Sequence, residues 1–408
     1  MTVIGRCSVS LCRRRAAPGG DPRELWGRSR GITGLIIATT LLLAVARCTA
    51  VEHVRHVVDG KVVQHDGEVV LEDPAGGVML RSADDQLHLI PAPRVRQRSH
   101  DDDEFELYDA DELGEKLLAE LPADFRLHQS KHYVVCYNTT DAYARWCSSL
   151  LERLQRAFIA YMAKRGCKVA APKWPLAVLI FADQASYAEH AKAELGPSVA
   201  NVIGYYSMAT NRIVMYDLTG AQAEARQFSN RGSSRDISVL LSQPAAEPLV
   251  ATIVHEATHQ IAFNCGVQKR FNDNPLWMSE GLAMYFETPD LSSSRSWSGV
   301  GEVNYQRWDQ FQANQDAGRL LPFEQLVGSD DAFRNPATAT DAYAQAWALS
   351  YFLIRWRPEQ YVAYVEQMAS KPPLTKVTPK QRVADFKKHF GDLEELRGEF
   401  QRQMSRIR

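Results

Sequence analysis

Hydrophobic and polar positions alternate along residues 51–98, most clearly in HVVDGKVVQHDGEVVLEDPAGGVMLRSADDQLHLIP. Alternation with a period of two predicts strands, and Asp59-Gly60 and Ala75-Gly76-Gly77 predict turns between them. We therefore expect a small all-β module of hairpins over residues 51–98. The charged residues that come next predict a linker over residues 99–126, or the solvated start of a helix.

Residues 127–247 mix apolar runs with helical periodicity. The runs HYVVCYNT and PLAVLIFAD predict two strands, and each precedes a predicted helix, the first from about Asp141 to Lys164 and the second over QASYAEHAKAEL. The stretch NVIGYYSMATNRIVMYDL, with a turn near Thr210-Asn211, predicts a hairpin. Residues 219–247 are polar and predict a loop.

From Pro248 onward the pattern is helical to the end of the chain. Strands that lead and helices that follow are typical of the α+β class. After the β module and the linker we therefore expect one domain over residues 127–408, with a strand-rich part at 127–247 and a helical part at 248–408.

The first 50 residues have a different composition. Residues 1–31 carry seven arginines against Asp21 and Glu24, and an apolar run from Ile32 to Ala46 follows them. A basic segment, a short apolar run and small residues after it are typical of a secretory signal. We expect residues 1–50 to be a cleaved signal peptide, with an uncleaved membrane anchor or a buried helix as alternatives, and an exported protein of the periplasm, the cell envelope or the medium.

Charge and cysteine content narrow the function classes. The formal net charge is −2, from 47 basic and 49 acidic residues, and this balance argues against a dedicated nucleic-acid binder. Outside the leader the cysteines form no C-x-x-C pair, which argues against a cysteine zinc site and leaves buried thiols or disulfides open. These cysteines are Cys136, Cys147, Cys167 and Cys265.

The stretch TIVHEATHQIAFNCG contains the motif H-E-x-x-H at residues 255–259. Pro248 suits the start of a helix and Gly266 its end, and at about 100° per residue the apolar side chains fall away from His255. His255 and His259 are four residues apart and share a face, so they can direct two nitrogens at one ion. Glu256 lies about 100° around from His255, where it can reach a metal-bound water. The alternative is an ordinary buried helix that holds two histidines.

A second helix is expected in NDNPLWMSEGLAMYFETPD, with Asn274 as its cap and Thr288-Pro289 as its end. Glu280 lies within this helix. A zinc site with two histidines needs a third protein ligand and an open position for water. Glu280 can supply that ligand, and the small Gly281 and Ala283 beside it would allow close packing against the first helix.

These motifs resemble known families. H-E-x-x-H followed by a glutamate within W-x-x-E-G-L-A resembles the gluzincin metallopeptidases, the clan of thermolysin and aminopeptidase N. The fuller pattern resembles the bacterial domain-of-unknown-function family DUF1570 over most of residues 100–400, in HYVVCYNT, GYYSMATNRIVMYD, HEATHQIAFNCG, NPLWMSEGLAMYFE and AYAQAWALSYFL. The resemblance implies a gluzincin-like, zincin-type catalytic domain with a small mixed sheet and helices, and no settled substrate.

One position departs from the gluzincin pattern. Thermolysin-like enzymes place an acid four residues after the ligand glutamate, where it orients a zinc histidine, and this chain has Met284 there. We expect Glu287 or a backbone carbonyl to take that role.

The resemblance also suggests a chemistry. Zn²⁺ held by His255, His259 and Glu280 would activate water, and Glu256 would act as general base in the hydrolysis of a peptide or protein substrate. Related enzymes stabilise the oxyanion with a tyrosine or histidine from a later helix, so Tyr343 is expected as the second catalytic residue. The strand from Asn211 to Tyr216 is expected at the sheet edge, where gluzincins hold peptides by strand addition.

Two other functions stay open beside a zinc metallopeptidase. One is a catalytically silent gluzincin-fold scaffold or binding protein of the cell envelope, although the intact Glu256 favours an enzyme. The other is a zinc hydrolase that acts on a non-peptide bond. We expect no nucleic-acid partner and a membrane contact only through an uncleaved N-terminal segment, and the oligomeric state stays open.

Overall fold

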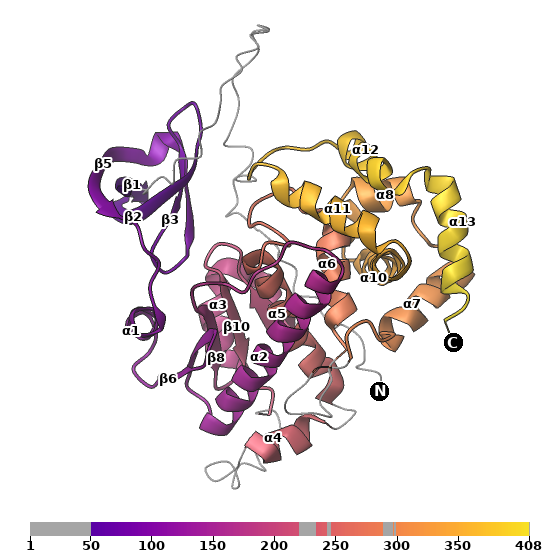
Figure 1. Cartoon of the computed structure of the whole chain (residues 1–408). Coiled ribbons are helices and arrows are strands. Elements are labelled where there is room, and N and C mark those ends of the chain that lie inside the picture. The colour runs from indigo at the N-terminus through magenta and orange to yellow at the C-terminus, as the bar shows by residue number, and fades with distance from the viewer. Residues whose placement is uncertain (1–49, 220–233, 243–245, 289–296, 298, 408) are drawn as a thin grey trace, which may run out of the picture.

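The computed structural model describes residues 50–219, 234–242, 246–288, 297 and 299–407 (Figure 1). The leader expected over residues 1–50 lies outside these ranges except for Ala50. Within the described ranges, no helix combines the length and the apolar character that a membrane span requires.

The N-terminal region is an antiparallel five-stranded sheet in the order β4-β3-β2-β1-β5. Its first two strands meet at the tight turn of Asp59 and Gly60, whose φ angles are 49° and 78°, as an Asp-Gly hairpin requires. The expected N-terminal all-β region is therefore confirmed. The strands are β1 (Ala50–Val58), β2 (Lys61–Glu72), β3 (Val78–Arg81), β4 (Leu87–Ile90) and β5 (Val95–Glu104).

Residues 99–126, expected to be a linker or the solvated start of a helix, are largely ordered: the linker was wrong for the strand up to Glu104, and the helix alternative agrees with the helix that begins at Ala110. Strand β5 runs to Glu104 and pairs with β1 at the sheet edge, where charged side chains are tolerated because they point into solvent. Helix α1 (Ala110–Glu120) follows, and it begins at a capping box formed by Asp109 and Glu112. Charge therefore marked a solvent-facing strand and the start of a helix.

The second sheet has five strands in the order β6-β7-β8-β10-β9. Strands β7, β8 and β10 are parallel, and β6 and β9 pair antiparallel at the two edges. Helices α2 and α3 connect β7 to β8 and β8 to the hairpin, with the bounds that the sequence predicted. The elements are β6 (Arg126–Gln129), β7 (Tyr133–Tyr137), α2 (Asp141–Lys164), β8 (Leu176–Phe181), α3 (Gln184–Leu195), β9 (Gly204–Tyr206) and β10 (Arg212–Tyr216).

Both faces of this sheet are buried. Alternate residues of β7 point to opposite sides, so Tyr133 and Val135 pack with α2 and α5 (Glu247–Asn264), while Val134 and Cys136 pack with α1 and α3. Burial on both sides explains why β7 and β8 read as continuous apolar runs. The sheet therefore presents one complete face to the helix that carries the HEATH motif.

The hairpin expected near Thr210-Asn211 is formed by β9 and β10, and Asn211 adopts a φ of 58° in its turn. Strand β10 lies between β8 and β9, so the prediction that residues 211–216 form the sheet edge was wrong, and the edge is β9. The order depends on pairing with β8, which is distant in sequence. The expected loop over residues 219–247 also contains a helix, α4 (Ser234–Leu241).

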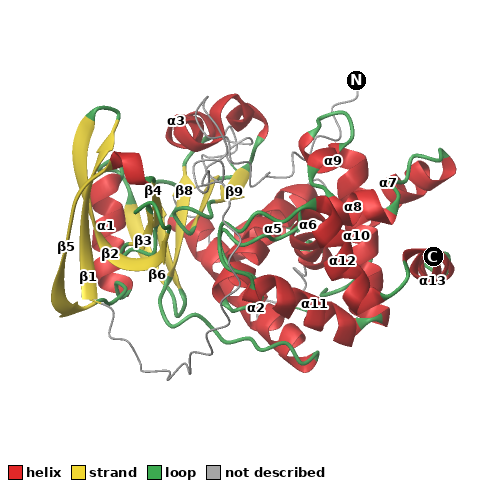
Figure 2. Cartoon of the chain, turned by 90° about the horizontal axis from the view of Figure 1, so that it is seen from above, coloured by secondary structure: helices red, strands yellow, loops and turns green. Residues whose placement is uncertain are grey.

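The C-terminal part is helical, and Figure 2 shows its helices gathered on the side of the molecule opposite the N-terminal sheet. Helix α10 lies at the centre of this part, since all its residues from Ala342 to Ile354 are buried. The chain is thus a mixed α+β protein. The remaining helices are α6 (Leu276–Phe286), α7 (Tyr305–Asp316), α8 (Phe323–Gly328), α9 (Asp331–Arg334), α10 (Ala339–Trp356), α11 (Pro358–Ser370), α12 (Pro379–Phe390) and α13 (Leu393–Met404).

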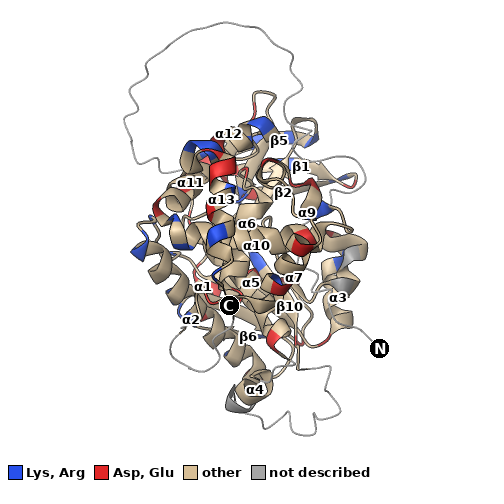
Figure 3. Ribbon diagram, turned by 90° about the vertical axis from the view of Figure 1, so that its right-hand side faces the viewer, with Lys and Arg blue, Asp and Glu red and all other residues tan. Residues whose placement is uncertain are grey.

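The distribution of charged residues and the state of the four cysteines can be compared with what the composition indicates. Acidic and basic residues interleave over the face that Figure 3 shows, in keeping with the near-neutral net charge of −2. Cysteines 136, 147, 167 and 265 are buried and free, so the thiol alternative holds for them and the disulfide alternative does not.

Candidate metal centre

Helix α5 places two imidazoles side by side. Pro248 lies in its first turn, and Gly266, at a φ of 98°, follows its end as predicted. The ring centroids of His255 and His259 are 4.8 Å apart, because four residues make about one helical turn. The apolar side of the helix packs against the sheet as expected, but the histidine side is buried too, with 3% exposure for each histidine.

Helix α6 brings the third side chain. Gly281 lets this helix approach α10 closely, because a Cβ atom there would lie 2.0 Å from Oγ of Ser350 and 2.7 Å from the carbonyl oxygen of Ala346. The neighbouring Glu280, 1% exposed, faces α5. The sequence suggested that this glycine would allow close packing against the helix that carries the motif, but the close contact that requires it is with α10.

A distant carboxylate caps the start of α6. Oδ1 of Asp330 accepts a 3.1 Å hydrogen bond from the backbone N–H of Leu276, and Arg382 holds both Asp330 and Asp273 in a buried ion-pair cluster. Asn274, which the sequence predicted as the cap, instead donates to the carbonyl oxygen of Lys269. That prediction was wrong because the acceptor comes from a residue far along the chain.

The three predicted ligands converge. Nε2 of His255 lies 3.2 Å from Oε2 of Glu280 and 3.2 Å from Nε2 of His259, and Nε2 of His259 lies 3.7 Å from Oε1 of Glu280. Their candidate ligand atoms all lie within 4.8 Å of one another, so the group can hold a metal ion. Two imidazole nitrogens and a carboxylate oxygen match the donor set of a zinc site.

Two of the three side chains have the ionisation state that a metal cation needs. Burial alone would raise the pKa of Glu280, but His259 and His255 outweigh it and lower that pKa to about 2. Burial lowers the pKa of His255, whereas its contacts with Glu280 and Glu287 raise it well above the usual value. Burial lowers the pKa of His259, which favours its neutral form. Metal ligation requires an ionised carboxylate and neutral imidazoles, so Glu280 and His259 have the form that a cation needs, whereas His255, whose acidic neighbours favour its protonated form, would release that proton when a metal binds.

Glu287 stands behind the first histidine. Its Oε2 lies 3.6 Å from Nδ1 of His255, and its Oε1 lies 3.4 Å from Nη2 of Arg307 in α7. The sequence proposed Glu287 or a backbone carbonyl for this orienting role, and the geometry favours Glu287. Arg307 was missed, since a lone arginine in a polar helix carries no signal of its partner.

Glu256 contacts the edge strand. Its Oε2 accepts a 2.8 Å hydrogen bond from the backbone N–H of Tyr206 in β9. The side chain is 2% exposed and lies on the same helix as both histidines. The general base expected from the motif is therefore anchored to the strand that ends the sheet, and no local pattern could have revealed this contact.

The structure does not bring the other predicted catalytic residue into this group by any described contact. Tyr343 lies in α10 with 2% exposure, and its ring packs edge-on against Phe333 at a centroid distance of 5.3 Å. Its role as oxyanion donor stays a prediction. Tyr205 and Tyr206 point to opposite faces of the sheet, as alternate residues of β9 do.

Comparison with known proteins adds one match. No curated protein matches this chain. A family model matches residues 249–375, from α5 to the segment after α11. This stretch contains the three candidate ligands, Glu256 and Glu287, while both sheets lie outside it. Residues 249–375 match the model of the family described as "Protein of unknown function (DUF1570)", which supports the family that the motifs resemble.

Proposed function

We propose that the protein is a zinc-dependent metallopeptidase with a gluzincin-like site, in which His255, His259 and Glu280 hold the metal. The observation that carries this proposal is the convergence of these three donors beside Glu256, on two helices that the fold locks together. When bound, zinc would supply a Lewis acid that activates water and polarises the scissile carbonyl. The substrate class is a peptide or protein.

The residues of the chain divide the remaining work. Glu256 takes the proton of the attacking water at a carboxylate oxygen and later gives it to the leaving amine. The backbone N–H of Tyr206 donates a hydrogen bond to Oε2 of Glu256 and so fixes the position of the carboxylate that takes up the proton. Glu287 orients His255 through Nδ1, and Arg307 keeps Glu287 ionised, because the pKa of this buried acid is lowered by Arg307 and His255 against the effect of burial.

Substrate would bind beside β9. This strand ends the described sheet, so those outward backbone groups other than the Tyr206 N–H, which already bonds Glu256, can pair with an extended peptide, as strand addition requires. The leader expected over residues 1–50 would place the reaction outside the cytoplasm.

One observation favours a second candidate, a catalytically silent zinc protein of the same fold. The three candidate ligands and Glu256 are only 1–3% exposed, whereas a catalytic zinc keeps a position open to water and substrate. A closed site is the usual arrangement when the metal serves stability.

Elemental analysis combined with a peptide-library assay tests both candidates. The purified chain should contain about one zinc, and His259→Ala should contain none. His389→Ala in α12, whose described contacts are a hydrogen bond to Gln367 and ring contacts with Tyr364 and Phe390, should keep the metal. Cleavage of library peptides supports the metallopeptidase. Zinc without cleavage supports the silent protein, and no zinc after reconstitution overturns both.

A further inference from the structure

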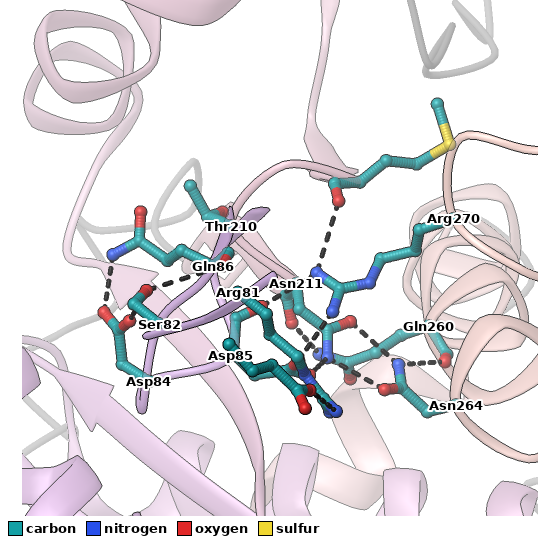
Figure 4. A network of polar contacts seen from close by, with 12 residues as sticks. Arg81, Ser82, Asp84, Asp85, Gln86, Thr210, Asn211, Gln260, Asn264 and Arg270 are labelled. Atoms are coloured by element: carbon teal, nitrogen blue, oxygen red, sulfur yellow. Dashed lines mark hydrogen bonds and ion pairs between the residues drawn. The ribbon is translucent and has the colours of Figure 1, made fainter. Parts of the chain in front are cut away.

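The turn between β3 and β4 carries the N-terminal module into contact with the second sheet (Figure 4). Asp85, with a φ of 61° and 6% exposure, lies at the tip of this turn. Its Oδ1 pairs at 2.6 Å with Nη2 of Arg270, in the segment between α5 and α6, and at 2.6 Å with Nε of Arg81. Its Oδ2 accepts a hydrogen bond from Nδ2 of Asn211. One carboxylate thus joins the module to two parts of the second unit.

Further contacts close the same junction. Asp84 pairs at 3.2 Å with Arg212 at the start of β10, and the backbone N–H of Leu87 donates a 2.7 Å hydrogen bond to the carbonyl of Ala209. The two units also share an apolar cluster, formed by Met79, Leu87, Phe271 and Leu374. Charge-assisted hydrogen bonds and buried apolar contacts together make a fixed interface.

Asn211 also forms hydrogen bonds with the helix that carries the motif. Its carbonyl oxygen accepts a 2.8 Å hydrogen bond from Nε2 of Gln260, the residue after His259. Its side-chain oxygen accepts 2.8 Å from Asn264 and 2.7 Å from the hydroxyl of Tyr206. Tyr206 is the residue whose backbone N–H holds Glu256. Asn211 therefore links Asp85 to both partners of the general base, the strand β9 and the helix α5.

We propose that Asp85 is a positioning residue, through which the N-terminal module holds β9 against α5 and sets the place of Glu256. The module is then part of the catalytic unit and not a separate binding domain. The catalytic consequence rests on the proposed function, but the mechanical link between Asp85 and β9 does not.

Hydrogen exchange measures that link without any activity. Asp85→Gly removes the carboxylate and keeps the positive φ free of strain, and Asn211→Gly does the same at the next position of the chain of contacts. In both variants of the full-length protein, amides of residues 204–207 and of the end of α5 should exchange about tenfold faster. Asp59→Gly, which makes the same change at a φ of 49° in the exposed β1–β2 turn, should leave them unchanged.

Kinetics separate positioning from loss of structure. Both variants should keep the wild-type zinc content while kcat falls more than KM rises, and Asp85→Asn, which keeps one acceptor oxygen and tolerates a positive φ, should recover part of kcat. If Asp85→Gly does not fold, hydrogen exchange in Asp85→Asn decides the result, because Asn211→Gly also removes the bonds of Asn211 itself to Tyr206 and Asn264.

The outcomes distinguish the two proposals. Unchanged exchange in β9 in a folded variant overturns the positioning role, whatever the activity. Faster exchange in a protein whose wild type cleaves no peptide upholds the link and overturns the proposed function. A loss of zinc in Asn211→Gly equal to that in His259→Ala would also overturn the positioning role, since the contact would then support the metal ligands and not Glu256.

Discussion

The backbone N–H of Tyr206 donates a 2.8 Å hydrogen bond to Oε2 of Glu256. This contact joins the strand at the edge of the sheet to the helix that carries both histidines, and it restricts the side chain of the proposed general base. A Gln side chain could accept the same hydrogen bond through its amide oxygen but could not take up a proton. A comparison of Glu256 with Gln at the same position therefore separates the effect of side-chain position from that of proton transfer.

We expect Glu256→Gln to lower kcat about a thousandfold with zinc content unchanged, since general base catalysis contributes about 10²–10⁴ in rate. Steady-state kinetics and elemental analysis on the same preparation check this. Glu247→Gln, an exposed change in the first turn of the same helix, should behave as wild type. Hydrolysis at the wild-type rate in Glu256→Gln would sink the mechanism.

Glu287→Gln should weaken zinc binding by about 10- to 100-fold, because a neutral amide is a weaker partner for Nδ1 of His255 and leaves Arg307 without its carboxylate. Competition with a chelator measures the dissociation constant. Glu302→Gln, an exposed change in the loop before α7, serves as the control. An unchanged constant would show that Glu287 does not support the ligand.

Two glycines in helices should respond in opposite directions to alanine. Gly281→Ala should lower the free energy of unfolding by about 1–3 kcal/mol, because the new Cβ would meet Ser350 and Ala346 at contact distances that side-chain movement cannot relieve. Gly398→Ala in α13 should raise it by up to about 1 kcal/mol, since its Cβ would meet only the mobile end of Arg402 at 3.3 Å. Urea denaturation compares them, and equal effects would contradict the packing at Gly281.

Stability should fall in mild acid because of a histidine stack in the N-terminal module. The rings of His65 and His88 lie 3.8 Å apart, and burial together with His65 lowers the pKa of His88 to about 4. The unfolded chain binds this proton near pH 6.5, so the unfolded state gains protons first and stability declines as the pH falls from about 6.5 towards 4.

This single histidine should cost roughly 2 kcal/mol between pH 7.5 and pH 5. Urea denaturation at the two pH values should show a smaller loss in His88→Gln than in wild type. His100→Gln, an exposed change on β5, should retain the wild-type loss. An identical loss in all three proteins would mean that the stack does not govern acid stability.

Local sequence patterns correctly predicted those elements whose own residues carry the signal. The helix from Asp141 to Lys164 was placed correctly because its own amphipathic period and the cap at Thr140 mark it. The linker was wrong for residues 99–104, and the edge position was wrong for residues 211–216, because these strands depend on pairing with β1 and β8. Asn274 failed as a cap for the same reason, since Asp330 reaches the helix from elsewhere.

The sequence by itself determined the candidate ligands. His255 and His259 share a face because four residues make about one helical turn, and Glu280 follows in a second helix after a loop. Only the tertiary structure decided which groups support them: Glu287 behind His255, Tyr206 on Glu256, and Asp85 against Asn211. The physical reason is that a helical period specifies which residues share a face, whereas contacts between distant segments arise from how the helices and sheets pack.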